Sequence, residues 1–152
     1  MKIVMMVLFA AVSLLSMEIQ PYAAIQMGAG DHVREKEFYN PQGRFGARIN
    51  TGYGIQPYVE HISSIPNAFD GYGFNSWGIN TVTPEWHNIS AWVGYGHKPE
   101  WGHNNKMYSE IFSQDYYRYG VKYRTGNQYL YLESIENRMY SFGIEWVFHV
   151  GD

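Results

Sequence analysis

Three polar residues between Val59 and Gly78 have the types and the spacing that acyl transfer requires. One residue separates His61 from Ser63, and Asn75 follows after a loop. A serine hydroxyl becomes a useful nucleophile when a neighbouring imidazole takes its proton, and a third group has to hold the imidazole in the right tautomer. We therefore predict His61 as the base, Ser63 as the nucleophile and Asn75 as the orienting group. An amide can orient the ring, but it does not offset imidazolium charge as a carboxylate does.

The segments on either side of the loop can bring these residues together. Both segments alternate between apolar and polar residues, which is typical of β-strands. If the two strands pair in the simplest register, Val59 lies opposite Trp77 and His61 lies opposite Asn75. The Asn75 side chain is then about 5 Å from His61 across the pair, and Ser63 is about 7 Å further along the strand on the same face. The pairing therefore predicts that the three side chains converge on one wall.

The same alternation recurs along the chain and predicts about eight strands. It is clearest near the end, where apolar or aromatic residues occupy every second position from Tyr140 to Phe148. Aromatic residues make up 18% of the chain, which favours strands because aromatic rings fit a pleated surface. The interleaved face carries charges of both signs that can pair with each other: Arg48, Glu60, Arg118, Lys122, Arg124, Glu133 and Glu145.

The connections between the predicted strands alternate in length. Short turns at one end and long loops at the other are typical of transmembrane β-barrels, with the turns in the periplasm and the loops outside the cell. We therefore predict an all-β fold, an eight-stranded antiparallel up-and-down transmembrane β-barrel. The short turns are Tyr53-Gly54, Thr83-Pro84-Glu85 and Thr125-Gly126-Asn127; the long loops are Gly30–Gly43, Ser64–Tyr72 and His97–Ile111; the last connection, near Glu136-Asn137, is short.

A soluble barrel or sandwich is the alternative fold, since the same alternation could place the aromatic face inside. Two features favour the membrane barrel. Buried charges survive when they are paired, which suits a small barrel filled by the charged face. In addition, Ser141-x-Gly143-x-x-Trp146-x-Phe148 resembles the C-terminal strand signal that the barrel assembly machinery of bacteria recognises. A polar interior at eight strands leaves no wide lumen, so we do not expect a pore.

The start of the chain predicts export. Met1-Lys2 precedes an uncharged apolar run, Ile3–Leu15, which is too short to span a bilayer comfortably as a helix. A short basic start followed by such a run is typical of a secretory signal peptide. We predict a signal peptide over residues 1–16, a barrel domain over residues 17–152, and a location in a bacterial-type outer membrane.

Composition and charge argue against several other functions. The net charge is −3 and no Lys/Arg cluster is present, so we expect no nucleic-acid partner. Cysteine is absent, which removes disulfides, thiolate metal sites and cysteine nucleophiles. His97, Glu100 and His103 are of metal-ligating types, but an ordinary polar loop explains them better. We predict neither a metal nor an organic cofactor.

The pattern His61-x-Ser63, followed by Gly73-x-Asn75, resembles the signature of the lipid A 3-O-deacylase (PagL-type) outer-membrane barrels. The resemblance implies a small barrel whose lipid-facing site hydrolyses an ester-linked acyl chain of lipopolysaccharide. It assigns the base to His61, the nucleophile to Ser63 and the third position to Asn75, where the best-understood members have glutamate. It implies lipopolysaccharide, other outer-membrane lipids and the assembly machinery as partners.

The residues leave a second function open. A small outer-membrane barrel can serve a structural or surface-interaction role without catalysis, through the Gly30–Gly43 and His97–Ile111 loops. Hydrolysis of an acyl ester by His61, Ser63 and Asn75 is the favoured hypothesis, and the non-catalytic barrel is the alternative.

Overall fold

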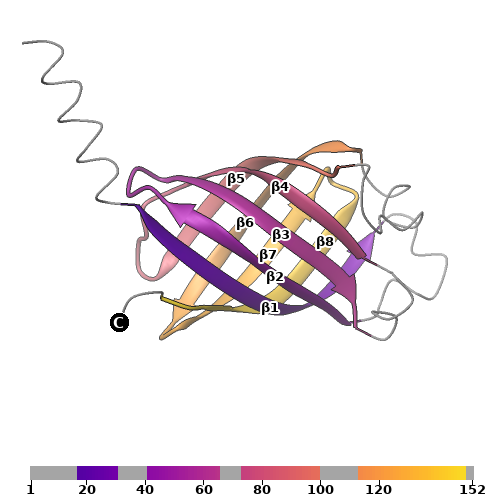
Figure 1. The fold of residues 1–152 in the computed structure, drawn as a ribbon. Coiled ribbons are helices and arrows are strands. Elements are labelled where there is room, and N and C mark those ends of the chain that lie inside the picture. The colour runs from indigo at the N-terminus through magenta and orange to yellow at the C-terminus, as the bar shows by residue number, and fades with distance from the viewer. Residues whose placement is uncertain (1–16, 31–40, 66–72, 100–112, 150–152) are drawn as a thin grey trace, which may run out of the picture.

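The chain folds into a single closed barrel of eight strands (Figure 1). The computed structural model describes residues 17–30, 41–65, 73–99 and 113–149. The predicted signal peptide, residues 1–16, and most of the three long loops lie outside these ranges. The strands are β1 (Glu18–Gly30), β2 (Pro41–Asn50), β3 (Ile55–Ser64), β4 (Gly73–Val82), β5 (Ile89–His97), β6 (Asp115–Thr125), β7 (Gln128–Ile135) and β8 (Met139–Val147).

Each strand pairs antiparallel with the next, and β1 closes the barrel by pairing antiparallel with β8. The predicted eight-stranded up-and-down barrel is confirmed. No helix among the described residues is long and apolar enough to cross a membrane.

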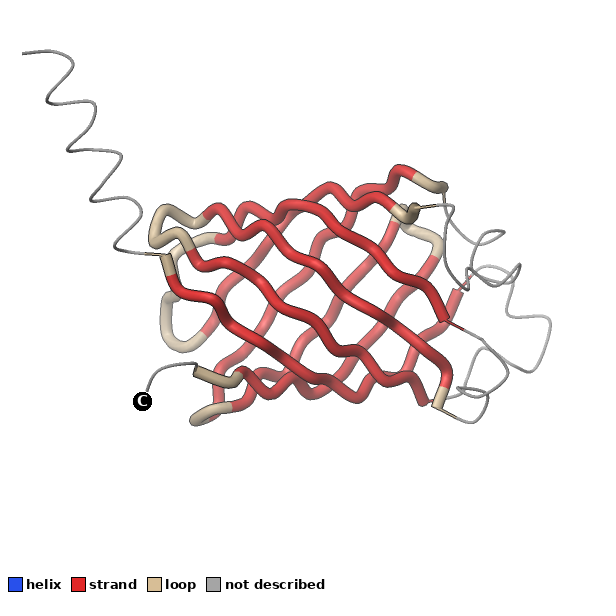
Figure 2. The backbone as a smooth tube through the Cα atoms, in the orientation of Figure 1, coloured by secondary structure: helices blue, strands red, loops and turns tan. Residues whose placement is uncertain are grey.

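Three short turns lie at one end of the barrel, which we call the turn end; it is on the left in Figure 2. They cover residues 51–54, 83–88 and 126–127, and the beginning of β1 and the end of β8 lie beside them. Left-handed backbone at Gly54 and Gly126 makes two of these turns tight, since glycine adopts a positive φ without a Cβ clash. The turn at residues 136–138 lies at the opposite end, as the alternation of strand direction requires.

The outward-facing positions form an apolar wall around the barrel. Val59 in β3 is 58% exposed and Leu132 in β7 is 60% exposed, although both are in the middle of regular strands. The aromatic and aliphatic residues predicted for one face lie on this wall, among them Ile25, Phe45, Trp77, Val93, Tyr119, Val121, Phe142 and Ile144. A soluble barrel would have the opposite arrangement, with the apolar side chains inside and the polar ones outside.

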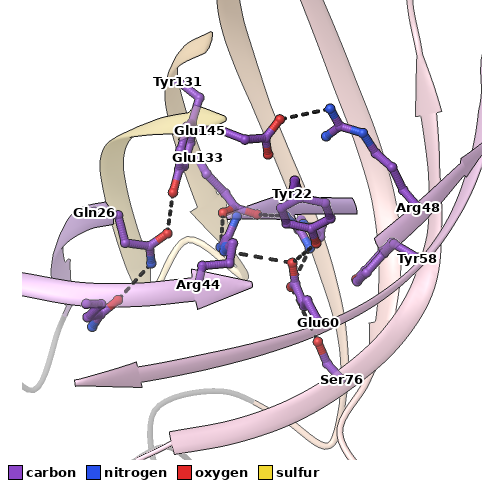
Figure 3. A network of polar contacts seen from close by, with 12 residues as sticks. Tyr22, Gln26, Arg44, Arg48, Tyr58, Glu60, Ser76, Tyr131, Glu133 and Glu145 are labelled. Carbon is purple, nitrogen blue, oxygen red and sulfur yellow. Dashed lines mark hydrogen bonds and ion pairs between the residues drawn. The ribbon is translucent and has the colours of Figure 1, made fainter. Parts of the chain in front are cut away.

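The lumen is filled by paired charges and tyrosines. Arg118 contacts Glu60 at 2.7 Å and Glu133 at 2.5 Å, and Arg44 contacts the same two carboxylates, so the four residues form a closed tetrad. Figure 3 shows this network, with Tyr22 donating a hydrogen bond to Glu60 at 2.8 Å. All four members of the tetrad are buried. The middle of the barrel is therefore packed solid rather than open.

The structure corrects four details of the predicted barrel, two of them in β2. The second strand ends at Asn50 and Tyr53 lies in the turn, because Gly52 and Gly54 have positive φ and break the strand. That strand also begins earlier than predicted, at Pro41, and so adds Arg44 to the charged interior.

The other two corrections concern β6. Arg124 does not join the interior network, because it pairs with Glu85 at the turn end, where its side chain is 48% exposed. Lys122 points into the lumen but has no ion pair among the described residues; its ammonium group lies 4.9 Å from the centre of the Tyr129 ring.

Candidate functional site

The predicted register of β3 and β4 is confirmed. Val59 lies opposite Trp77, and His61 lies opposite Asn75. Since Val59 and Trp77 are both on the exposed wall, His61 and Asn75 also face outward, near the end of the barrel opposite the turn end. The two residues lie where an apolar wall gives way to the loops.

His61 and Asn75 are joined by a hydrogen bond of 2.9 Å between Nδ1 of the ring and Oδ1 of the amide. An amide oxygen only accepts, so Nδ1 carries the hydrogen and donates it. The other ring nitrogen, Nε2, then presents its lone pair. With the amide oxygen of Asn75 as the partner of Nδ1, the ring is in the tautomer that a general base needs, and the orienting role of Asn75 stays a prediction.

Ser63 and Nε2 of His61 both lie beside Gly73. Ser63 faces Gly73 on β4 and Gly43 on β2. A Cβ atom placed on Gly73 would be 3.0 Å from Nε2 of His61 and 3.0 Å from Cβ of Ser63. Both residues therefore border the same small space, which Gly73 keeps open because it has no side chain.

No hydrogen bond joins Ser63 to His61 within the described residues. The Ser63 hydroxyl can point in another direction after a rotation about the Cα–Cβ bond. Catalytic hydrogen bonds are often long or unformed in a free enzyme. The structure thus brings His61 and Asn75 into contact and places Ser63 beside them without completing the triad.

The wall around the site is aromatic. The rings of Phe45 and His61 lie 5.0 Å apart between centroids and are tilted by 35°. Phe45 is opposite His61 on β2 and is itself 58% exposed. Glu60, the nearest carboxylate in sequence, points into the lumen and is held there by Arg118, so it cannot serve His61. Among the described neighbours, Asn75 is the group that orients the ring.

A second imidazole lies on the same wall, and its role was not predicted. His97 ends β5 rather than lying in a loop, and its Nδ1 is 2.6 Å from a carboxylate oxygen of Asp115 on β6. Tyr95 donates to the same oxygen at 2.7 Å, and the Trp77 ring lies 5.1 Å from the His97 ring. Extending the alternation of Ile89–Tyr95 by two residues would have placed His97 on the outer face.

Within the described part of the chain, no group of three or more His, Asp or Glu side chains could hold a metal ion. Glu100 and His103, which share the third long loop with His97, lie outside the described residues.

The comparisons with known proteins concern the fold. A designed protein described under "De novo design of transmembrane beta-barrels" superposes with a TM-score of 0.57 at 13% identity, covering 86% of this chain and 95% of that chain. Neisserial surface protein A superposes with a TM-score of 0.40 at 13% identity, covering 89% of this chain and 97% of that one. No family model matches the chain, and neither does any curated protein. The designed barrel supports the barrel fold, and the deacylase resemblance of the His61 motif remains a prediction.

Proposed function

We propose that this chain is a bacterial outer-membrane barrel that hydrolyses an ester-linked acyl chain of lipid A at the outer wall. One observation supports the proposal. Asn75 accepts a hydrogen bond from Nδ1 of His61, and the other ring nitrogen, Nε2, borders the same space as Ser63 on the apolar outer wall. The pattern of residues resembles that of the lipid A 3-O-deacylases, which act on such an ester.

The membrane location rests on the outer wall. Side chains such as Leu132 and Phe142, each 60% exposed, cannot remain in water over a whole barrel surface without a large free-energy cost. A closed barrel leaves no unpaired strand edge, which is the condition for β-structure in a bilayer. With the turn end in the periplasm, His61 and Ser63 lie toward the outer leaflet, where lipopolysaccharide esters are found.

The reaction requires only groups of this chain and water. Ser63 Oγ attacks the ester carbonyl carbon while its proton passes to Nε2 of His61. The bond from that carbon to the sugar oxygen breaks, and Nε2 returns the proton to the leaving oxygen, so the acyl group stays on Ser63. Water then gives a proton to Nε2 and attacks the acyl carbon. The bond from that carbon to Ser63 Oγ breaks, and Nε2 returns the proton to Oγ, which releases the fatty acid and restores the serine.

Mass spectrometry of lipid A from cells that express the chain tests the proposal. We expect the loss of one ester-linked acyl group, and we expect Ser63→Ala and His61→Ala to abolish that loss. His87→Ala is a matched control, because His87 lies in a turn at the other end of the barrel and is exposed. Unchanged lipid A from folded protein in the outer membrane would leave the non-catalytic barrel as the better account.

A further inference from the structure

The half of the lumen nearer the turn end contains a small cavity of about 30 Å³. It lies between the charged tetrad and the turns, and its volume accommodates one or two particles of the size of a water molecule. Polar and aromatic residues make up almost all of its lining, and among them are Arg48, Asn80, Trp92, Arg118, Lys122 and Glu145.

The charges along this cavity do not balance. Arg118 is neutralised by the two carboxylates of the tetrad, and Arg48 pairs with Glu145 at 2.9 Å. Lys122 remains without an ion pair among the described residues, although its side chain points into the lumen. An unpaired ammonium group inside a barrel is costly, since burial removes its water without supplying a negative partner.

Hydrogen-bond donors along the same cavity also lack acceptors within the described ranges. The indole Nε1 of Trp92 and the Nε of Arg118 are buried, and neither has a hydrogen-bond partner among the residues that the structure describes. Both are N–H groups that can only donate. The buried amide oxygen of Asn80 is unpartnered as well, and exchanging the oxygen and nitrogen of this amide would present a further donor to the cavity.

We propose that this cavity binds one small inorganic anion of the chloride class. The unpaired ammonium group of Lys122 supplies the charge, and the free N–H groups of Trp92 and Arg118 supply the hydrogen bonds. The site is independent of the outer-wall site, because it lies on the inner face of β4, β5 and β6 and shares none of its residues. An anion there would complete the polar interior and so stabilise the folded barrel.

Diffraction from crystals grown in bromide tests the occupancy directly. We expect an anomalous peak in the lumen within hydrogen-bond distance of Lys122 Nζ and Trp92 Nε1. Density in the cavity without an anomalous signal would mean that water alone fills it, and the proposal would be wrong.

A stability measurement tests the same site in solution. The purified barrel is unfolded thermally in increasing chloride, with gluconate keeping the ionic strength constant. Binding to the folded state alone raises the melting temperature as the anion concentration rises. We expect this rise in the native chain, and a melting temperature that is independent of chloride overturns the proposal.

Two variants and a control locate the effect. Lys122→Met should abolish the chloride-dependent rise. Trp92→Phe should weaken the apparent affinity about tenfold, because it removes one N–H donor while keeping an aromatic side chain on β5. Arg124→Met is the control, since it removes a positive charge from the same strand but outside the cavity. A chloride effect lost equally in Arg124→Met would show general screening rather than a site.

Discussion

At the scale of the residue, the candidate site depends on one imidazole whose two nitrogens have different environments. Nδ1 of His61 is occupied by Asn75, and Nε2 borders the space that Gly73 leaves beside Ser63. Each of these two features can be changed alone. We expect a change beside Nε2 to slow ester hydrolysis and a change at Asn75 to speed it.

Gly73→Ala should abolish most of the ester hydrolysis. Its methyl group would stand 3.0 Å from both His61 Nε2 and Ser63 Cβ, in the place where a substrate carbonyl has to enter, and 2.9 Å from the backbone oxygen of Ile62, so the strands must also shift slightly there. Gly43→Ala is the control for a methyl group on the other side of Ser63, because among the described residues a Cβ there would meet only Ile65, at 3.8 Å. Rates are compared per amount of folded protein, measured by heat-modifiable gel migration; equal losses in both variants would contradict the role of this space.

Asn75→Asp should increase the rate. A carboxylate at this position would keep the hydrogen bond of 2.9 Å to Nδ1 and would also stabilise the imidazolium that forms when Ser63 is deprotonated. In serine hydrolases the loss of this carboxylate costs a factor of about 10⁴, so a gain of about tenfold here is a modest expectation. Turnover of lipopolysaccharide by the two proteins measures it, and a slower Asn75→Asp enzyme would argue against catalysis through His61.

At the scale of the element, the tetrad of Arg44, Glu60, Arg118 and Glu133 joins strands that are far apart in sequence. It holds β2, β3, β6 and β7 against one another across the lumen. Because every member is buried, the removal of one charge leaves another without compensation.

Glu60→Gln should therefore destabilise the barrel by about 3–5 kcal/mol, the usual cost of breaking a buried ion pair. Urea unfolding of protein in lipid vesicles gives the free energy. Glu85→Gln serves as the comparison, because its pair with Arg124 is partly exposed and such pairs contribute about 1 kcal/mol or less. Similar losses of unfolding free energy in the two variants would mean that the tetrad contributes no more to stability than an exposed ion pair.

Much of this arrangement could be predicted from the sequence, because strand periodicity fixes which face each residue occupies. The opposition of His61 and Asn75 followed from the alternation on either side of one loop, and the structure has the same register. Arg44 was missed because Pro41-Gln42-Gly43 precedes it and gives no apolar alternation from which a strand could be recognised. The direction of the Ser63 hydroxyl could not be predicted either, since a serine rotamer depends on neighbours that pairing brings together only in space.

At the scale of the whole molecule, an outer-membrane barrel needs its apolar wall to face lipid. Leu132→Arg places a charge in the middle of the wall and should cost about 2–4 kcal/mol, whereas Ile19→Arg, near the turn end, should cost about 1 kcal/mol or less. The two wild-type side chains are almost equally exposed, at 60% and 58%, so exposure alone predicts no difference. Unfolding in vesicles measures both, and equal costs would contradict a membrane-spanning barrel.

A reconstituted reaction distinguishes an esterase from a barrel without catalysis. Purified chain in lipid vesicles is mixed with lipopolysaccharide, and the free fatty acid released is followed over time beside a Ser63→Ala preparation of equal folded content. If the barrel hydrolyses the ester through Ser63, the native chain releases one acyl chain per lipid A molecule and the variant releases none. Equal release by both proteins, or none by either, would contradict hydrolysis through Ser63.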